Sequence, residues 1–240
     1  MSTETVRASI LRALKAYAGP GSNLRLQAYL GSPFPVLGVS AAEMREVMKA
    51  RIDEFKKMSI NELNDLAELL WTGRTFEEKT FAISLFRRFA KSLDKRSWST
   101  MNRWINQSEG WALCDSLGSG PVSAMLYREQ ELFKDVLRWT QSTNLWRRRV
   151  SAYAMRDFVS AGELKKPFTL LERLLYDEQF WVQRAVGTWL RECWKKDKQG
   201  TEKFLLKHAS GLPRVVITVA AERASKAFRR SLRLKPLPRQ

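Results

Sequence analysis

Cysteine and histidine are scarce in this chain of 240 residues, which has two cysteines and one histidine. Zinc sites are built from several Cys and His ligands, and Ser-His-Asp or Cys-His catalysis needs a histidine beside the nucleophile. The residues concerned, Cys114, Cys193 and His208, are too few to form such sets. Zinc fingers, Cys-His pairs and Ser-His-Asp triads are therefore excluded, and any catalysis must depend on carboxylates.

Long apolar runs are also lacking. No stretch of about 18 apolar residues occurs, as a membrane-spanning helix would require. Residues 1–17 contain acidic side chains and lack the apolar core of a secretion signal, so we do not expect them to be one. We expect a cytosolic protein that does not insert into a membrane.

Acidic side chains are outnumbered by basic ones. The chain has 25 Asp and Glu against 42 Lys and Arg, which gives a net charge of +17 and a pI near 10.2. Such a surplus places a strong positive field over the surface whatever the fold. Nucleic acid or an anionic membrane is the default partner.

Helix-forming segments fill most of the chain. Between the prolines, stretches rich in Leu, Ala, Glu, Arg and Lys show apolar residues three and four apart, and none shows sustained two-residue alternation. This pattern predicts an all-α fold. The helices predicted are 40–56, 60–71, 75–91, 97–107, 130–141, 145–159, 167–176, 180–195, 201–209 and 213–229.

The chain also repeats itself. Aromatic residues recur at a spacing of 35 residues, three times running, at Phe76, Trp111, Trp146 and Trp181. One more step in each direction reaches helical stretches at Ala41 and Val216 that lack the aromatic residue, as terminal repeats often do. A further helix lies between successive copies, so each unit is a helix pair that must stack on its neighbours to bury its apolar face. The prediction is an α-solenoid of about six HEAT-like repeats.

Equivalent positions in such a stack line up across its concave face. One row contains Lys79, Cys114, Arg149 and Arg184, with Arg147 and Arg148 beside it. The row predicts a basic concave groove that suits a rod-shaped polyanion. A solvated charged face is the alternative interpretation.

One acid breaks the repeat pattern. The position of Asp115 is held in the other copies by Thr80, Val150, Ala185 and Ala220, and by Arg45 in the first. An acid at such a site costs several kcal/mol of desolvation unless it is paired, hydrogen-bonded or facing a cationic ligand. Either Asp115 forms a structural ion pair with an arginine of the next repeat, such as Arg149, or it has a function.

Trp111 precedes this acid by four residues, so indole and carboxylate share one face of one helix. An indole can brace a deoxyribose while a carboxylate stabilises the oxocarbenium-like transition state of glycosidic cleavage or positions water. A single carboxylate suffices when the leaving base is already cationic, as an N3- or N7-alkylated purine is. The other aromatic residues of the repeats, Trp146, Trp181 and Trp189, fit a packing role better than a ligand platform.

At these residues the chain resembles the AlkD family of bacterial alkylpurine DNA glycosylases, over most of its length. Four segments carry the resemblance: Phe34–Val39 with the nearby Tyr29, Trp111–Ser116, Asn144–Arg149, and Phe180–Gly187 followed by Leu190–Glu192. The second is similar to the family's Trp-x-x-x-Asp-Ser segment, and the third to its Asn-x-Trp-x-x-Arg segment. Each motif is weak alone, whereas four in order and in repeat phase are fairly specific.

The resemblance implies a HEAT-like solenoid that removes cationic alkylpurines such as 7-methylguanine and 3-methyladenine from duplex DNA without a metal or organic cofactor. It implies that Asp115 is the catalytic carboxylate, that Trp111 braces the sugar-phosphate, and that Arg149 contacts DNA beside the lesion. It further implies that the damaged base is not drawn into a pocket, unlike ordinary base flipping. Further expected DNA contacts are Tyr29, Arg147, Arg148, Arg184, Thr188, Trp189 and Arg191.

One position departs from the family pattern. Where the family has a tryptophan directly after the glycine of the last segment, Thr188 follows Gly187 here and tryptophan comes one place later, at Trp189. A shift of one residue turns a helical side chain by about 100°. Either Trp189 reaches the site through local adjustment, or the cleft has lost one wall and is wider.

We therefore expect a monomeric all-α solenoid over residues 1–228, followed by a basic, disordered tail over residues 229–240. Its expected function is that of a DNA glycosylase in base-excision repair of alkylation damage. We expect it in the cytoplasm, associated with the nucleoid through DNA. The alternatives are a non-catalytic DNA-binding or damage-sensing repeat protein and a HEAT-type protein-interaction scaffold. Steep salt dependence of DNA binding would favour either DNA interpretation over the scaffold.

Overall fold

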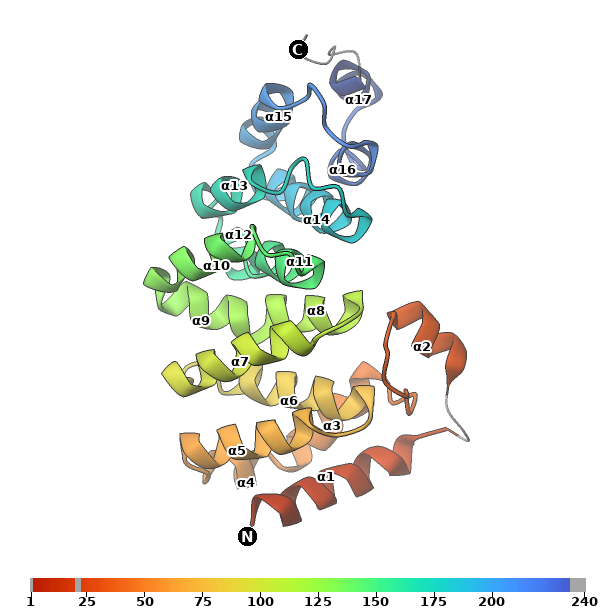
Figure 1. Ribbon diagram of the computed structural model, residues 1–240, viewed down its shortest axis with the longest axis vertical. Helices are drawn as coiled ribbons and strands as arrows, with labels where there is room; N and C mark the ends of the chain where they lie inside the picture. The colour runs from red at the N-terminus through yellow and green to blue at the C-terminus, as the bar shows by residue number, and fades with distance from the viewer. Residues whose placement is uncertain (1, 20–22, 234–240) are drawn as a thin grey trace. The chain divides into compact units, whose positions relative to one another are not determined.

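The computed structural model describes residues 2–19 and 23–233. Within these ranges every regular element is a helix and no strand is present, so the predicted all-α class is confirmed. Figure 1 labels the helices in chain order, with the colour running from red at the N-terminus to blue at the C-terminus. The chain forms two compact units, residues 1–128 and 129–240. That residues 1–228 act as a single domain stays a prediction.

The first unit, residues 1–128, is built from stacked helix pairs. Helix α5 packs against α1 and α7, while its partner α6 packs against α3 and α8. This is the repeat organisation of an α-solenoid. The helices are α1 (Thr3–Tyr17), α2 (Leu24–Leu30), α3 (Ala41–Ala50), α4 (Ile52–Lys56), α5 (Ile60–Trp71), α6 (Phe76–Arg88), α7 (Lys95–Gln107), α8 (Trp111–Leu117) and α9 (Ser123–Arg128), with a single turn η1 (Gly118–Val122) between the last two.

The second unit, residues 129–240, follows the same rule. Helix α14 is its centre and packs against α11 on one side and α16 on the other, with α13 and α15 beside it. The elements are η2 (Gln130–Leu132), α10 (Phe133–Trp139), α11 (Leu145–Tyr153), α12 (Arg156–Ala161), α13 (Lys165–Glu172), α14 (Phe180–Lys196), α15 (Lys198–Lys207), α16 (Arg214–Ala220) and α17 (Lys226–Arg233).

The 35-residue period is confirmed by where the helices begin. Phe76 and Trp111 are the first residues of α6 and α8, and Trp146 and Trp181 are the second residues of α11 and α14. The aromatic residue therefore marks the first turn of one helix in each pair.

Local sequence explains several of these starts. Helices α3, α5 and α6 each begin with a capping box, in which Ser40, Ser59 or Thr75 accepts a hydrogen bond from the third helical residue. That residue is a glutamate each time, and its side chain accepts a hydrogen bond from the cap backbone. Both exchanges satisfy backbone N–H groups that a helix start leaves unpaired.

Helix α1 is absent from the helices predicted above. Its apolar residues Val6, Ile10 and Leu14 lie four apart and are buried, and Ser2 caps its first turn. These are ordinary helix signals.

The C-terminal boundary also differs from the prediction. Helix α17 runs to Arg233, past the start of the tail predicted at residue 229, because Leu232 is buried and anchors its last turn. Residues 234–240 lie outside the described residues. Across the described part of the chain, we find no helix with the length and apolar character needed to cross a membrane.

The contact between α14 and α16 depends on a glycine. A Cβ added at Gly187 would lie 2.7 Å from the Cβ of Val219 and 3.2 Å from the carbonyl oxygen of Val216. Gly187→Ala is therefore expected to lower the free energy of unfolding by about 1–3 kcal/mol through overpacking. Thr188→Ala, one place along on the half-exposed side, is the matched control and should change it by no more than about 0.5 kcal/mol. Urea unfolding followed by circular dichroism checks this, and a Gly187→Ala protein as stable as the parent would contradict it.

Candidate functional site

Helix α8 has one buried face and one that reaches solvent. Ala112, Leu113 and Cys114 are buried, whereas Trp111 and Asp115 are half-buried. Residues four apart lie one above the other on a helix. The structure therefore brings the predicted indole and carboxylate together on one accessible face of α8, which we call the α8 face.

Tyr29 joins the α8 face from a distant part of the sequence. The Nε1 of Trp111 donates a hydrogen bond to the backbone carbonyl of Tyr29 at 2.7 Å. Their rings meet edge to face with centroids 5.5 Å apart, and Tyr29 is 69% exposed. The bond fixes the indole, and an exposed aromatic ring is placed beside it.

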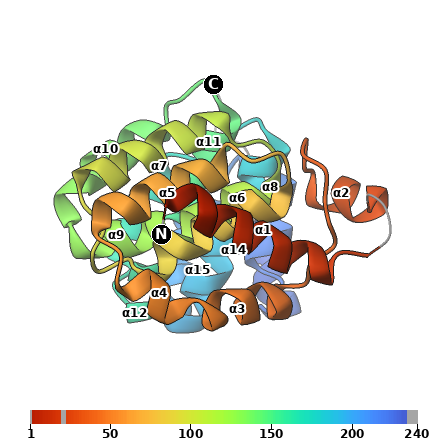
Figure 2. The same ribbon diagram turned by 90° about the horizontal axis from the view of Figure 1, so that it is seen from below.

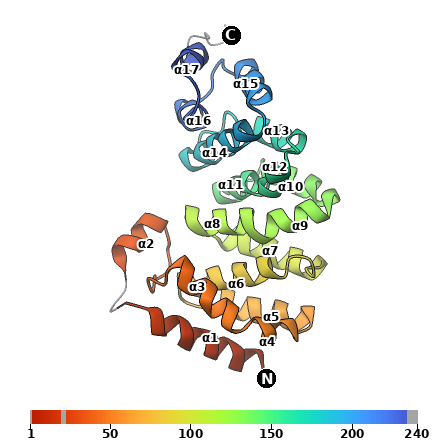
Figure 3. The same cartoon turned by 180° about the vertical axis from the view of Figure 1, so that it is seen from behind.

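Two glycines allow this approach. The chain leaves α2 through Gly31, in the left-handed conformation, and passes Gly110, the residue before α8. A Cβ on Gly110 would lie 1.9 Å from the carbonyl oxygen of Gly31, and the φ of Gly110 is +82°. Only glycine fits this close backbone contact. Helix α2 stands apart from the stacked pairs beside the start of α8 (Figures 2 and 3).

A buried carboxylate holds the loop that follows α2. Glu77, in the first turn of α6, is 2% exposed and accepts hydrogen bonds from the backbone N–H groups of Leu37 and Gly38, both at 3.0 Å. The N–H of Phe76 donates to the carbonyl of Pro35 at 3.0 Å in the same place. We call this arrangement the Glu77 clamp. It was not predicted, although Leu37 and Gly38 stood out in the sequence as part of a motif.

The predicted basic row is not an exposed wall. Lys79 is 5% exposed, Cys114 is fully buried and Arg149 is 4% exposed, so only Arg184 of the four is exposed. This expectation was wrong for Lys79, Cys114 and Arg149, because in those three repeats the position three residues after the aromatic faces the neighbouring helices. The same orientation explains why the two charged side chains, Lys79 and Arg149, are held by specific contacts.

Lys79 shows such contacts. Its Nζ donates to the carbonyl oxygens of Trp71 and Gly73, the latter at 3.1 Å, and lies 4.2 Å from the ring centre of Phe34. The lysine thus caps the end of α5. Burial lowers the pKa of Lys79, and Glu78 opposes this effect.

Arg149, in the second unit, is held between two aromatic rings. Its guanidinium lies 5.0 Å from the ring of Tyr153 and 5.7 Å from that of Trp181. It donates hydrogen bonds to the carbonyl of Trp181 and, at 3.2 Å, to the hydroxyl of Tyr153. The positive charge is thereby fixed in position at the first turns of α11 and α14.

The two arginines before it differ. Arg148 binds both carboxylate oxygens of Asp177, at 2.6 and 3.2 Å, and also the carbonyl of Ser142 at 2.7 Å. Both side chains of this pair are largely buried, so Arg148 has a structural partner rather than a solvent-facing guanidinium. Arg147 lies over the ring of Trp139 at 5.0 Å, and burial lowers its pKa.

Helix α14 presents three predicted contact residues, Arg184, Thr188 and Arg191, on one face, which we call the α14 face. Trp181, which the sequence suggested as a packing residue, is exposed on the same face. Arg191 is engaged by Glu222 and Glu192. Burial acts to lower the pKa of Arg191, but the hydrogen bonds and negative charges of Glu222 and Glu192 together outweigh that effect and raise it.

Trp189 lies on a different side of α14. It is 7% exposed and meets Tyr153 edge to face at 5.6 Å, and its Nε1 has no hydrogen-bond partner among the described residues. The solvent-facing position thus belongs to Thr188, and the tryptophan one place later is part of the packing between α14 and α11. The first alternative above, in which Trp189 turns outward, is not what the structure shows.

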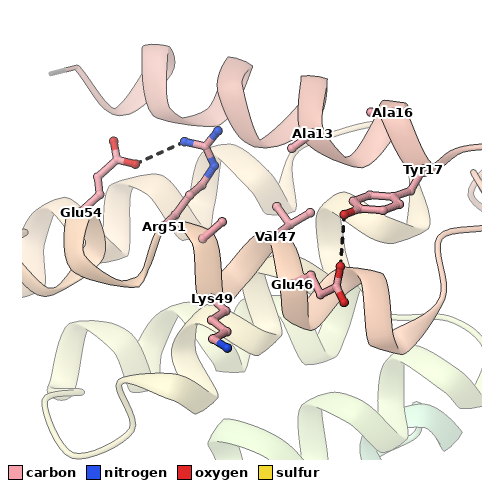
Figure 4. Close-up of a pocket in the computed structure, with 9 residues that line it drawn as sticks. Ala13, Ala16, Tyr17, Glu46, Val47, Lys49, Arg51 and Glu54 are labelled. Carbon is pink, nitrogen blue, oxygen red and sulfur yellow. Dashed lines mark hydrogen bonds and ion pairs between the residues drawn. The ribbon is translucent and has the colours of Figure 1, made fainter.

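A hollow of about 850 Å³ between α1 and α3 lies apart from these residues (Figure 4). Tyr17 donates to Glu46 across it at 3.3 Å, and Arg51 pairs with Glu54 at 3.3 Å. None of the predicted site residues lines this hollow. Within residues 2–19 and 23–233, no group of three His, Cys, Asp or Glu side chains is placed to hold a metal ion.

Comparison with known proteins adds a family match. The model of the family described as DNA alkylation repair enzyme matches residues 10–224. No curated protein matches this chain.

Solved structures show the same fold. One described as a predicted DNA alkylation repair enzyme from Enterococcus faecalis has a TM-score of 0.76 at 17% identity, over 87% of this chain and 97% of that one. AlkD2 from Streptococcus mutans gives 0.67 at 16% identity, over 92% and 98%. The protein smu.31 from Streptococcus mutans UA159 gives 0.61 at 19% identity, over 77% and 92%.

The Glu77 clamp can be tested by replacing one carboxylate oxygen with an amide nitrogen. In Glu77→Gln the amide nitrogen cannot accept the hydrogen bond of one backbone N–H, which leaves a buried donor unpaired at a cost of about 1–3 kcal/mol. We expect faster amide hydrogen exchange over residues 30–38. Glu109→Gln, an exposed acid just before α8, is the matched control and should leave this exchange unchanged. Unaltered exchange over residues 30–38 in Glu77→Gln would show that the clamp does not hold the loop.

Proposed function

Because this chain belongs to the DNA alkylation repair enzyme family, we propose that it is a DNA glycosylase that hydrolyses the N-glycosidic bond of cationic alkylated purines in duplex DNA. The α8 face is the observation that supports the proposal. It holds a half-buried carboxylate, Asp115, one turn from the fixed indole of Trp111. 7-Methylguanine and 3-methyladenine are the substrates that suit it.

The proposed reaction breaks the bond between C1′ of the sugar and the purine nitrogen. The bonding electron pair leaves with the base and neutralises the positive charge of the alkylated ring. The sugar is left with oxocarbenium character, which the Asp115 carboxylate stabilises. Water, oriented by the same carboxylate, adds to C1′ and loses a proton, and an abasic site remains.

A single carboxylate limits the substrate class. Asp115 is the only acidic residue in α8, and Glu109, just before that helix, is exposed. Retaining and inverting glycosidases use a second carboxyl group to protonate their leaving group. A cationic purine needs no such proton, because it departs as a neutral base. The α8 face therefore fits alkylated purines better than it fits ordinary nucleosides.

The other residues are proposed to hold DNA. The exposed ring of Tyr29 and the indole of Trp111 offer apolar surface to a sugar. Arg149 supplies a positioned positive charge for a phosphate beside the lesion. Arg147, Arg184, Thr188 and Arg191 are proposed as further contacts along the backbone, whereas Arg148 and Trp189 support them through packing.

A non-catalytic DNA-binding protein is the second candidate. The observation that favours it is the α14 face, where Thr188 occupies the solvent-facing position and Trp189 is buried. A cleft with one aromatic wall fewer would hold the sugar less firmly. Binding to DNA would then persist without base release.

One assay separates the two candidates. The parent protein, incubated with a duplex containing 7-methylguanine, is expected to release the free base and leave abasic sites. Asp115→Asn keeps the shape and removes the charge, so we expect single-turnover release to slow by about 100-fold or more. Fluorescence anisotropy should show that this variant still binds the duplex, and Glu109→Gln should release base at the parental rate.

Two results would contradict this proposal. Equal release by the parent and Asp115→Asn would remove Asp115 from the mechanism. DNA binding without release by the parent would favour the non-catalytic candidate.

A further inference from the structure

A second hollow in the first unit has a basic lining. It measures about 310 Å³ and lies where α3, α6 and the turn after α8 meet. Arg45 comes from α3, and Arg87 and Arg88 come from the last turn of α6. No acidic residue is among those that line it. We call it the arginine cavity.

Two of these arginines are available to a ligand. Arg45 and Arg88 are exposed, and within the described residues neither side chain forms a hydrogen bond or ion pair. Arg87 is half-buried and donates to the carbonyl of Gly120 at 3.3 Å. That bond ties the end of α6 to the kink in η1 at Gly120, where ψ is −113°. One side of the cavity is thus fixed, while two guanidinium groups remain free to bind an anion.

Part of the cavity lining, which we call its floor, is apolar. It consists of Met44, Met48 and Ile83. A free inorganic anion would gain nothing from such a floor, whereas the carbon face of a deoxyribose can pack on it. Arginines over an apolar floor therefore suit a sugar joined to a phosphate, because guanidinium groups bind phosphate oxygens in pairs.

One residue that lines the cavity is the sequence neighbour of a residue of the α8 face. Ser116 lines the cavity and directly follows Asp115 in α8. Ser116 is exposed, so its hydroxyl can donate to a phosphate oxygen. A strand whose damaged nucleotide lies on the α8 face would thus bring a neighbouring sugar-phosphate to the arginine cavity.

We infer that the arginine cavity binds one phosphodiester, with its deoxyribose, of the DNA strand on which the α8 face acts. Arg45 and Arg88 hold the phosphate oxygens, Arg87 stiffens the wall, and the methionines receive the sugar. The contact positions the strand without touching the reacting bond. The inference rests on the proposed function for the identity of the ligand as DNA.

The test joins a double variant to a modified DNA. Arg45→Gln/Arg88→Gln removes the two free charges, and Arg12→Gln/Lys15→Gln removes two exposed charges from α1, which does not line the cavity. Arg45→Lys/Arg88→Lys keeps the charges and loses paired hydrogen bonding. Thermal unfolding of each variant verifies that it folds.

Anisotropy titrations with a duplex measure binding over a range of salt concentrations. The binding constant K falls as salt rises. For the cavity variant, loss of one phosphate contact should make the plot of log K against log[salt] less steep by about 1. The control pair on α1 should keep the parental slope, and the lysine pair should keep most of it. An unchanged slope in the cavity variant would overturn the inference.

A scan with methylphosphonates then locates the contact. Each duplex carries one uncharged methylphosphonate at a different position around the lesion. The parent should lose affinity sharply at one position, and the cavity variant should show no additional loss there, because both changes remove the same contact. Additive losses at every position would overturn the inference.

The methylphosphonate scan tests the arginine cavity, and the base-release assay tests the glycosylase proposal, so either one can fail without the other. If the parent excises 7-methylguanine but the scans of parent and variant match, the arginine cavity is not a phosphate site and the glycosylase proposal stands. If the scan locates the contact while no base is released, the cavity stands and the glycosylase proposal falls. A parent protein with no affinity for DNA would overturn both.

Discussion

The Glu77 clamp is the constraint on which the arrangement of the first unit depends. A carboxylate that is 2% exposed binds the backbone N–H groups of Leu37 and Gly38 and so fixes the segment between α2 and α3 to the start of α6. The same segment connects to α2, which lies beside the start of α8. There the Nε1 of Trp111 donates a hydrogen bond to the backbone carbonyl of Tyr29. The accessible indole beside Asp115 is therefore oriented by residues that never approach it. Burying the charge is tolerable because two donors satisfy it.

The helices and their phase could be predicted because the signals are local. A 35-residue step located the first turns of α6, α8, α11 and α14, and a spacing of four residues placed Trp111 and Asp115 on one face. The predictions that were wrong concerned the exposure of charged side chains, which depends on the neighbours of each helix. The basic row looked solvent-facing in the sequence, yet Lys79 caps α5 and Arg149 lies between Tyr153 and Trp181. Arg148 and Asp177 are 29 residues apart, so their ion pair could not be predicted from the local sequence.

Each unit carries some of the residues proposed to act on DNA. Asp115, Trp111 and the arginine cavity lie in the first unit, and Arg149 and Arg184 lie in the second. Many of the chain's basic side chains are neutralised or buried by their own contacts, so net charge alone overstates what DNA can reach. Thr188 and Trp189 show how much one position along a helix matters, since Thr188 reaches solvent while Trp189 lies in the packing of α11 and α14.

The account rests on a leaving group that is already cationic, because Asp115 is the only acidic residue in α8. Comparing two duplexes tests this most directly, one with 7-methylguanine and one with its neutral isostere, 7-deaza-7-methylguanine. Under single-turnover conditions, the account predicts release of the cationic base and no detectable release of the neutral one, although both duplexes bind. Release of both bases at similar rates would contradict it, since a proton donor would then be required.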